Sequence, residues 1–225
     1  MSSGKLYIVS TPIGNLADFT FRAVDILKSV SLIAAEDTRV SGVLLKHYEI
    51  ATSMLPYHDH NKEQATPGLL RKLERGDDIA LISDAGTPLI SDPGFFLVRA
   101  AVAQGVEVIP IPGASAMLAA LVASGLPSDR FTFEGFLPRK KGRQTRFKVL
   151  AEDPRTIIFY ESPHRINRTL KDISEYMGDR QVVIGREITK KFEEFIRGPV
   201  SEIREQLDVR SIKGEVVIMI GGNKA

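Results

Sequence analysis

One segment concentrates the polar side chains and loop-forming residues that a ligand-binding site needs. Residues 83–94 read Ser-Asp-Ala-Gly-Thr-Pro-Leu-Ile-Ser-Asp-Pro-Gly and follow the apolar run 79–82. Its short polar side chains, which can bond a ligand or the loop's own amides, are those of Asp84, Thr87, Ser91 and Asp92. Ligands of open α/β sheets bind beyond the carboxyl ends of strands, so we expect this loop to line a binding site. An ordinary strand-to-helix connection is the alternative.

Acidic and basic residues also follow an earlier apolar run, at Glu36-Asp37-Thr38-Arg39. Such a group can handle a proton and a phosphate, which favours the substrate side of a site. Asp37 as the N-cap of the next helix is the competing interpretation. His58-Asp59-His60 offers two imidazoles and a carboxylate, but no third strong metal ligand is identifiable. We therefore predict a polar rim there and no metal.

The first turn, residues 10–16, reads Ser-Thr-Pro-Ile-Gly-Asn-Leu. It contains neither the G-x-G-x-x-G of dinucleotide-binding proteins nor the phosphate-cradling G-x-x-x-x-G-K-[ST], which disfavours both classes. Pro12 stiffens this turn and removes a backbone donor. An uncharged or cationic part of a ligand would suit the turn better than a phosphate.

Residues 139–148 carry six cations and no acid, and we call them the basic segment. These cations are Arg139, Lys140, Lys141, Arg143, Arg146 and Lys148. A local patch of this kind can bind RNA phosphates even though the whole chain, with 30 Lys and Arg against 28 Asp and Glu, carries only +2. A solvated helix face is the alternative. Only Phe147 is aromatic within the segment, so the pattern does not predict base stacking there.

Composition and periodicity predict an α/β protein of two domains. In residues 1–112, short apolar strands alternate with amphipathic helices, which indicates a mostly parallel sheet covered on both faces. In residues 113–225, several strands follow one another with little helix between them, which favours a mixed sheet. Cysteine is absent, and neither a signal peptide nor a membrane span is visible, so we expect a soluble cytoplasmic protein.

Five motifs together resemble the tetrapyrrole methylase superfamily, and within it the branch that methylates ribosomal RNA of the small subunit. They are residues 6–16, Ala35-Glu36-Asp37-Thr38-Arg39, residues 83–94, Pro112-Gly113-Ala114-Ser115-Ala116, and Tyr160-Glu161-Ser162-Pro163-His164-Arg165. The relatives that methylate corrin precursors carry a glycine-rich first loop and a Gly-Asp-Pro form of the loop after the fourth strand. This sequence has Thr-Pro-Ile-Gly-Asn and Asp-Ala-Gly-Thr-Pro instead, which favours the RNA branch.

The resemblance implies an S-adenosylmethionine enzyme with the cofactor in the cleft between two α/β domains, usually a homodimer. The RNA branch methylates a cytidine ribose 2′-hydroxyl in the decoding region of 16S ribosomal RNA. The resemblance also implies that relatives often continue beyond residues 221–225, where this sequence ends. The additional part would be a small helical segment that belongs to the RNA-docking surface.

Carried over to this sequence, the resemblance implies three sets of site residues. The cofactor would contact Pro12, Asp84, Ala85, Gly86, Thr87, Pro88, Ser115 and Ala116. The candidate proton acceptors are Asp37 and Glu36, with Arg39 and Lys190 positioning a phosphate. RNA would be bound by the six cations of the basic segment together with His164 and Arg165. For Ser115, simple N-capping is an equal alternative.

Two other functions remain open at this stage. A methyltransferase acting on a tetrapyrrole or corrin precursor would share the fold and the cofactor but would not need the basic segment. A non-enzymatic RNA-binding assembly factor would keep the basic segment and lose the cofactor.

Overall fold

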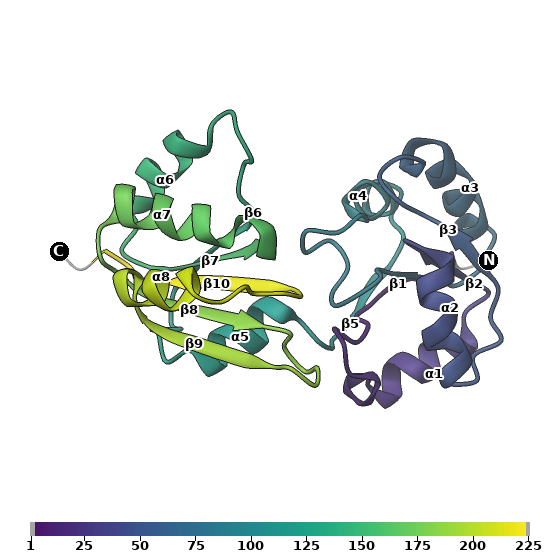
Figure 1. Cartoon of the computed structure of the whole chain (residues 1–225). Helices are drawn as coiled ribbons and strands as arrows, with labels where there is room; N and C mark the ends of the chain where they lie inside the picture. The colour runs from purple at the N-terminus through teal and green to yellow at the C-terminus, as the bar shows by residue number, and fades with distance from the viewer. Residues whose placement is uncertain (1–2, 224–225) are drawn as a thin grey trace. The chain divides into compact units, whose positions relative to one another are not determined.

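The computed structural model describes residues 3–223, and it divides into two compact units (Figure 1). The first unit extends to Ser115 and the second begins at Ala116. Residues 1–2 and 224–225, the last two of which belong to the terminal run noted above, lie outside the described chain. We describe each unit by itself.

The first unit is built around a parallel sheet of five strands in the order β3-β2-β4-β1-β5. Its elements are β1 (Leu6–Val9), the 3-10 helix η1 (Leu16–Asp18), α1 (Phe21–Ser29), β2 (Leu32–Ala35), α2 (Thr38–His47), β3 (Met54–Pro56), α3 (Lys62–Glu74), β4 (Ile79–Ile82), α4 (Phe95–Ala103) and β5 (Val108–Ile111). Every residue of β2 and β4 is buried, as expected of strands covered on both faces. The predicted parallel sheet is confirmed.

Two hydrophobic clusters cover the two faces of this sheet. On one face, Val9 and Ile33 pack with Leu27 of α1 and Leu44 of α2. On the other face, residues of β1, β2 and β4 pack with Leu69 and Leu73 of α3 and Leu97 and Ala101 of α4. Because alternate side chains of a strand point to opposite faces, each apolar run supplies both clusters.

The order of the strands brings three loops to one edge of this sheet. The chain that leaves β1 packs α1 against one face of the sheet, and the chain that leaves the neighbouring β4 packs α4 against the other, so the two connections diverge toward opposite faces. Such a divergence opens a binding crevice beyond the carboxyl ends of the strands. The loops that follow β1, β2 and β4 all lie at this edge, where the sequence placed the polar motifs.

Helix α3 begins at Lys62, well before the apolar residues Leu69 and Leu70 that pack against the sheet. Pro67 lies inside the helix and removes one backbone hydrogen bond. The hydroxyls of Tyr57 and Thr66 form a buried hydrogen bond of 3.2 Å that ties this first part of the helix to the end of β3. Tertiary packing therefore helps to offset the backbone hydrogen bond that Pro67 removes.

The second unit contains a mixed sheet of five strands in the order β6-β7-β10-β8-β9. Its elements are α5 (Ala116–Ser124), β6 (Phe131–Phe136), α6 (Arg143–Ala151), β7 (Thr156–Glu161), the 3-10 helix η2 (Pro163–Arg165), α7 (Ile166–Met177), β8 (Gln181–Arg186), β9 (Glu194–Pro199), α8 (Val200–Asp208) and β10 (Val216–Ile220). Strands β6 and β7 are parallel and the other neighbours are antiparallel, which confirms the predicted mixed sheet.

Helices cover both faces of the second sheet. One face packs against α6, α7 and α8 through a cluster that includes Phe147, Phe159 and Leu170. Helix α5 packs against β7, β8 and β10. Within residues 3–223, no helix combines the length and the apolar character needed to cross a membrane.

Candidate functional site

Backbone amides and carboxylates of two neighbouring strand ends bond one another at the carboxyl edge of the first sheet. The Asp37 N–H donates to Asp84 Oδ1 at 3.0 Å, and the Asp84 N–H donates to Glu36 Oε2 at 3.4 Å. Strands β2 and β4 are paired up to Ala35 and Ile82, so these residues follow directly from aligned strand ends. The structure thus brings together the two acidic motifs that the sequence placed in separate loops.

Asp37 is the N-cap of α2, as the competing interpretation of the sequence had it. Its carboxylate accepts the Arg39 N–H at 2.8 Å and also binds the Arg39 guanidinium, with Nη2 2.6 Å from Oδ2. The hydrogen bonds from the Arg39 side chain and backbone hold the pKa of Asp37 well below its usual range. A carboxylate so stabilised in its ionised form is a weak proton acceptor.

Three other carboxyl groups at this edge, which we call the carboxylate cluster, have pKa values that are raised and not lowered. They are Glu36, Asp84 and Asp92. Burial is the main cause that raises the pKa of each. For Asp92, burial and then the negative charges of Glu36 and Asp84 raise the pKa to about 6. Removal of water and mutual repulsion therefore disfavour three negative charges in this place, and a cation would relieve them.

The loop after β1 is fastened to the loop after β4 by backbone hydrogen bonds. Thr11 and Gly86 form an isolated antiparallel bridge, with N–H to carbonyl distances of 2.8 and 3.1 Å. Gly86 has a φ of +83°, and a Cβ there would lie 3.2 Å from Ile13 Cγ2. The Thr87 hydroxyl bonds the Ser10 hydroxyl at 2.9 Å and donates to the Ala114 carbonyl at 3.1 Å. These contacts fix the backbone beside the carboxylate cluster.

The remaining residues predicted to contact the cofactor differ in how far they are buried. Pro12 and Pro88 are buried, and Ala85 is exposed. Ser115 ends the first unit and Ala116 is the first residue of α5 in the second. The structure therefore gathers Pro12, Asp84, Ala85, Gly86, Thr87 and Pro88 at one sheet edge.

The histidines of the third strand end lie close to this edge. The rings of His58 and His60 are 5.9 Å apart, and the charge of His58 acts to lower the pKa of Glu36 against its overall rise. Across residues 3–223, no group of three or more His, Asp or Glu side chains is arranged to hold a metal ion.

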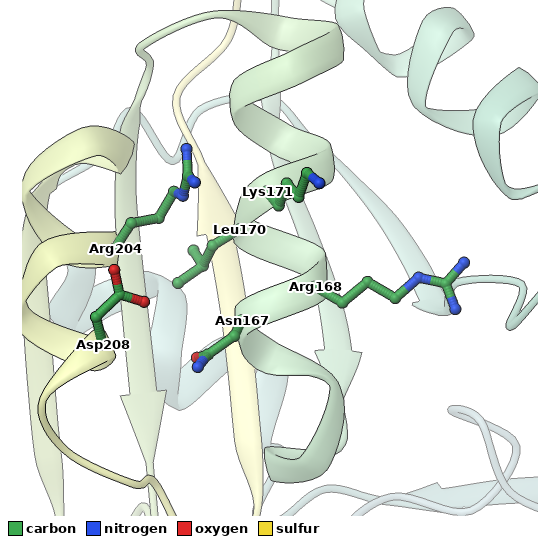
Figure 2. A pocket seen from close by; sticks show the side chains of 6 residues that line it. All are labelled: Asn167, Arg168, Leu170, Lys171, Arg204 and Asp208. Carbon is green, nitrogen blue, oxygen red and sulfur yellow. The ribbon is translucent and has the colours of Figure 1, made fainter.

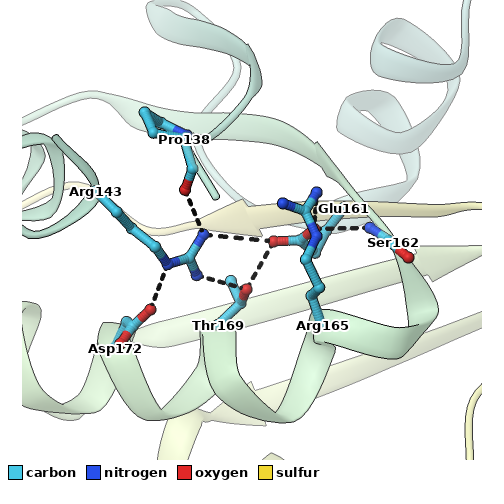
Figure 3. A network of polar contacts seen from close by, with 7 residues as sticks. All are labelled: Pro138, Arg143, Glu161, Ser162, Arg165, Thr169 and Asp172. Carbon is cyan, nitrogen blue, oxygen red and sulfur yellow. Dashed lines mark hydrogen bonds and ion pairs between the residues drawn. The ribbon is translucent and has the colours of Figure 1, made fainter. Parts of the chain in front are cut away.

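In the second unit, the buried carboxylate of Glu161 joins the motif at the end of β7, residues 160–165, to the basic segment (Figure 3). The side chain of Glu161 is fully buried, and it accepts the Ser162 N–H at 2.7 Å and the Thr169 hydroxyl at 2.7 Å. An Arg165 Nη2 lies 2.6 Å from its Oε1. Arg143 Nη1 lies 3.9 Å from Oε2 on the other side. Buried charges of this kind are stable only when they are paired and hydrogen-bonded, as here.

The prediction that Arg143 contacts RNA is wrong, because its side chain is only 3% exposed. Its Nε lies 2.6 Å from Asp172 Oδ2, and its Nη2 donates to the Thr169 hydroxyl at 2.8 Å. Its remaining nitrogen donates to the Pro138 carbonyl at 3.2 Å (Figure 3). Arg143 thus holds the start of α6 onto α7.

Other predicted cations are partly engaged within the second unit. Arg146 pairs with Glu134, and Arg165 pairs with Glu161. Lys190 lies 3.0 Å from both Glu187 and Glu215. The predicted groups that stay exposed are Arg139, Lys140, Lys141, Lys148 and His164. Any phosphate contact by this surface depends mainly on these.

A separate groove of about 340 Å³ lies between α7 and α8. It is lined by Asn167, Arg168, Leu170, Lys171, Arg204 and Asp208 (Figure 2). Figure 2 shows the Arg168 side chain extending away from α8 and the Arg204 side chain extending upward from α8, so these side chains do not converge on one ligand. We do not include this groove in the site.

The sequence placed Asp92 among the polar side chains that could bond a ligand but not among the cofactor contacts, and it did not predict the pairing of Glu134 with Arg146. The position of Asp92 in a loop rich in glycine and proline was the available signal, since such loops bury short polar groups. Nothing in the spacing of Arg143 distinguishes it from the exposed cations around it.

Comparison with known proteins places this architecture in a family. The fold and the sheet-edge loops define an α/β protein of the methylase type. The family model for Tetrapyrrole (Corrin/Porphyrin) Methylases matches residues 5–204, and the chain belongs to this family. The resemblance found in the sequence is confirmed.

Relatives and solved structures agree with this assignment. The chain is 52% identical over 228 residues to a ribosomal RNA small subunit methyltransferase I of Escherichia coli O157:H7, covering 100% of the chain and 80% of the relative. It is 55% identical to a protein of the same name from Pasteurella multocida, covering 98% and 80%. A uroporphyrin-III C-methyl transferase from Thermus thermophilus, solved with S-adenyl homocysteine, shares the fold at 19% identity, with a TM-score of 0.66 and coverage of 96% and 97%.

We predict that Asp92→Asn makes the first unit more stable at neutral pH but not at acid pH. The folded chain retains the proton of Asp92 up to about pH 6, whereas the unfolded chain loses it near pH 4. The contribution of this group to stability is therefore fully present below pH 4 and lost as the pH rises through 6. In urea unfolding, the gain of the variant over the parent should grow by about 1–3 kcal/mol between pH 4 and pH 7.5.

Asp25→Asn, on the exposed surface of α1, is the matched control and should show no such growth. A gain for Asp92→Asn that stays constant with pH would contradict the assignment.

Proposed function

We propose that this protein transfers the methyl group of S-adenosylmethionine to the 2′-hydroxyl of a cytidine ribose in the decoding region of 16S ribosomal RNA. Membership of a methylase family and the identity of about half the residues to small-subunit RNA methyltransferases support the reaction. The observation that carries it in the structure is the carboxylate cluster beside the fastened loops of β1 and β4. The reaction would take place in the cytoplasm, where ribosomal subunits are.

The residues at the sheet edge fit the cofactor chemically. S-adenosylmethionine, when bound, supplies a methyl group activated by a positively charged sulfur. The carboxylate cluster provides negative charge that burial and repulsion leave uncompensated, and ionised Asp84 can accept hydrogen bonds. Pro12, Ala85, Gly86, Thr87 and Pro88 shape the surrounding backbone, and Ser115 and Ala116 would add amide donors.

For the hydroxyl proton, Glu36 is a better acceptor than Asp37. Burial raises the pKa of Glu36, whereas the guanidinium of Arg39 keeps Asp37 ionised. Arg39 itself is exposed and can contact a phosphate beyond its pair with Asp37. Lys190 is the second candidate for this role, although two carboxylates already hold it.

RNA would be bound by the exposed cations of the basic segment and by His164. Arg139, Lys140 and Lys141 lie in the turn before α6, and none of them has an ion pair with another described residue. The buried carboxylate of Glu161 holds this turn, through Arg143, and the His164 turn in one rigid arrangement. Preorganised cations lose less entropy when they bind a phosphate backbone.

We also propose that the protein is a homodimer that pairs the outer face of α5. This helix consists of apolar residues up to Ser124, and its outer face exposes Leu118 and Val122, the latter by 80%. A second copy of the same face is the simplest cover for it, since most soluble oligomers are symmetric pairs.

Methyl transfer to ribosomal subunits tests the proposed reaction. With methyl-labelled S-adenosylmethionine, we expect label in small ribosomal subunits as 2′-O-methylcytidine, identified by mass spectrometry after nuclease digestion. Asp84→Ala should weaken cofactor binding by about tenfold or more, because a charged hydrogen-bond acceptor is worth about 1.5–3 kcal/mol. Asp25→Asn is the control and should methylate normally.

Label in a corrin precursor but not in the subunits would favour the small-molecule reaction instead. Calorimetry that detects no binding of S-adenosylmethionine would leave only an RNA-binding assembly role.

Charge on the α5 face should break the dimer. Sedimentation of the parent should give twice the mass of one chain, and Val122→Asp should give a single chain, because an apolar contact cannot bury an unpaired carboxylate. Val209→Asp, at an equally exposed position after α8, should leave the dimer intact. A parent that sediments as one chain would overturn this proposal.

A further inference from the structure

A β-bulge in the second unit places an exposed aromatic ring beside the basic segment. The register between β6 and β7 shifts between the pair Phe133 and Ile158 and the pair Phe136 and Tyr160. Three residues on β6 thus span two residues on β7, so one residue is extra. Gly135, with a φ of +58°, supplies the backbone conformation that this bulge needs.

The bulge changes the face on which Phe136 lies. In a regular strand, residues three apart point to opposite faces. Here both Phe133 and Phe136 contact the ring of Tyr160, with centroid distances of 5.1 and 5.5 Å. The three rings therefore share one face of the sheet, and we call Phe133, Phe136 and Tyr160 the aromatic platform.

The outermost ring of the platform faces solvent. Phe136 is 58% exposed, although a large apolar side chain is normally buried. Its backbone is held from both sides: Glu134 pairs with Arg146 of α6, and Leu137 is buried in the core. An exposed ring on a fixed backbone loses little conformational entropy when a partner covers it.

Positive charge follows this ring closely along the chain. Arg139, Lys140 and Lys141 follow Phe136 within five residues and are exposed. The acid closest to the ring in sequence, Glu134, is already neutralised by Arg146. An occupant of this surface must therefore combine a flat apolar face with a negatively charged chain.

We infer that the aromatic platform stacks an unpaired base of the RNA substrate while the adjacent cations bind its phosphates. This inference rests on the proposed function and adds to it a residue, Phe136, that would recognise single-stranded RNA by stacking on an unpaired base. Unstacked bases bind exposed aromatic rings whatever their sequence, and a basic surface follows their backbone. The basic segment alone offered no such ring, because Phe147 is completely buried.

The test compares the binding of a short fluorescein-labelled oligocytidylate with that of an abasic RNA of the same length, by fluorescence anisotropy. Phe136→Ala should weaken oligocytidylate binding by about 5- to 140-fold, which corresponds to about 1–3 kcal/mol for one stacked base. The same variant should bind the abasic RNA as the parent does. Phe136→Trp should restore the preference for bases, and Phe136→Leu should not.

Two control variants separate stacking from charge and from surface hydrophobicity. Lys140→Ala with Lys141→Ala should lower the slope of log affinity against log salt by about 1.4, since each cation contributes about 0.7 on a single strand. Phe136→Ala should leave this slope unchanged. Phe21→Ala, which removes an even more exposed ring at the start of α1, should change neither quantity.

Several results would overturn the inference. They are binding of oligocytidylate by Phe136→Ala within twofold of the parent, equal binding by Phe136→Leu and Phe136→Trp, and a loss confined to S-adenosylmethionine affinity. Methylation of small subunits by the parent, measured in parallel, tests the proposed function separately. If the parent methylates subunits and Phe136→Ala binds RNA normally, only the stacking role fails. If the parent transfers no methyl group, the reaction fails, and the preference for bases still decides the role of the platform.

Discussion

Charge crowding at the carboxyl edge of the first sheet is the constraint on which the rest of this account depends. Paired strands β2 and β4 end together, which keeps Glu36 and Asp84 close, and the loop after β4 brings Asp92 near both. Burial and repulsion raise the pKa values of Glu36, Asp84 and Asp92, which means that the free protein is less stable than it would be without these charges. Strain of this kind is typical of binding sites, where a ligand supplies the missing partner.

Asp37 lies at the same edge but, unlike the carboxylate cluster, it has a cationic partner in Arg39. Arg39 and the free N–H groups at the start of α2 stabilise its negative charge, and its pKa falls. Neighbouring acids in one short motif thus acquire opposite properties. One organises the helix, and burial of the other, Glu36, favours its protonated form.

In the second unit, one cation of the basic segment is likewise buried where carboxylates pair with it, and the cations just before it stay exposed. Arg143 is buried against Asp172 and Glu161, and it fixes the turn that carries Arg139, Lys140 and Lys141. The exposed cations owe their arrangement to the buried one. Replacing Glu161 would leave Arg165 without its carboxylate and Arg143 with Asp172 alone, so this acid has a structural importance that its motif alone does not reveal.

The sequence predicted the two sheets, their parallel and mixed character, and the loops that form the site, because apolar periodicity and clusters of glycine and proline reflect local structure. It could not predict which members of a charged run are buried. Nothing in the sequence around Arg143 and Lys140 distinguishes them. The packing of α7 against α6 buries Arg143 and leaves Lys140 exposed. Nor could it predict that Phe136 shares a face with Phe133, since strict alternation places them on opposite faces and only the bulge at Gly135 reverses this. Long-range packing decided both cases.

Calorimetric titration with S-adenosylmethionine and with S-adenosylhomocysteine, between pH 5 and pH 7, tests the central role of the carboxylate cluster most directly. The two ligands differ in the methyl group and in the positive charge on sulfur. If ionised carboxylates bind this charge, the affinity for S-adenosylmethionine should fall by about tenfold as Asp92 gains its proton below pH 6, while that for S-adenosylhomocysteine changes much less. Asp92→Asn should remove the difference. An equal pH dependence for both ligands, or none for either, would contradict the account.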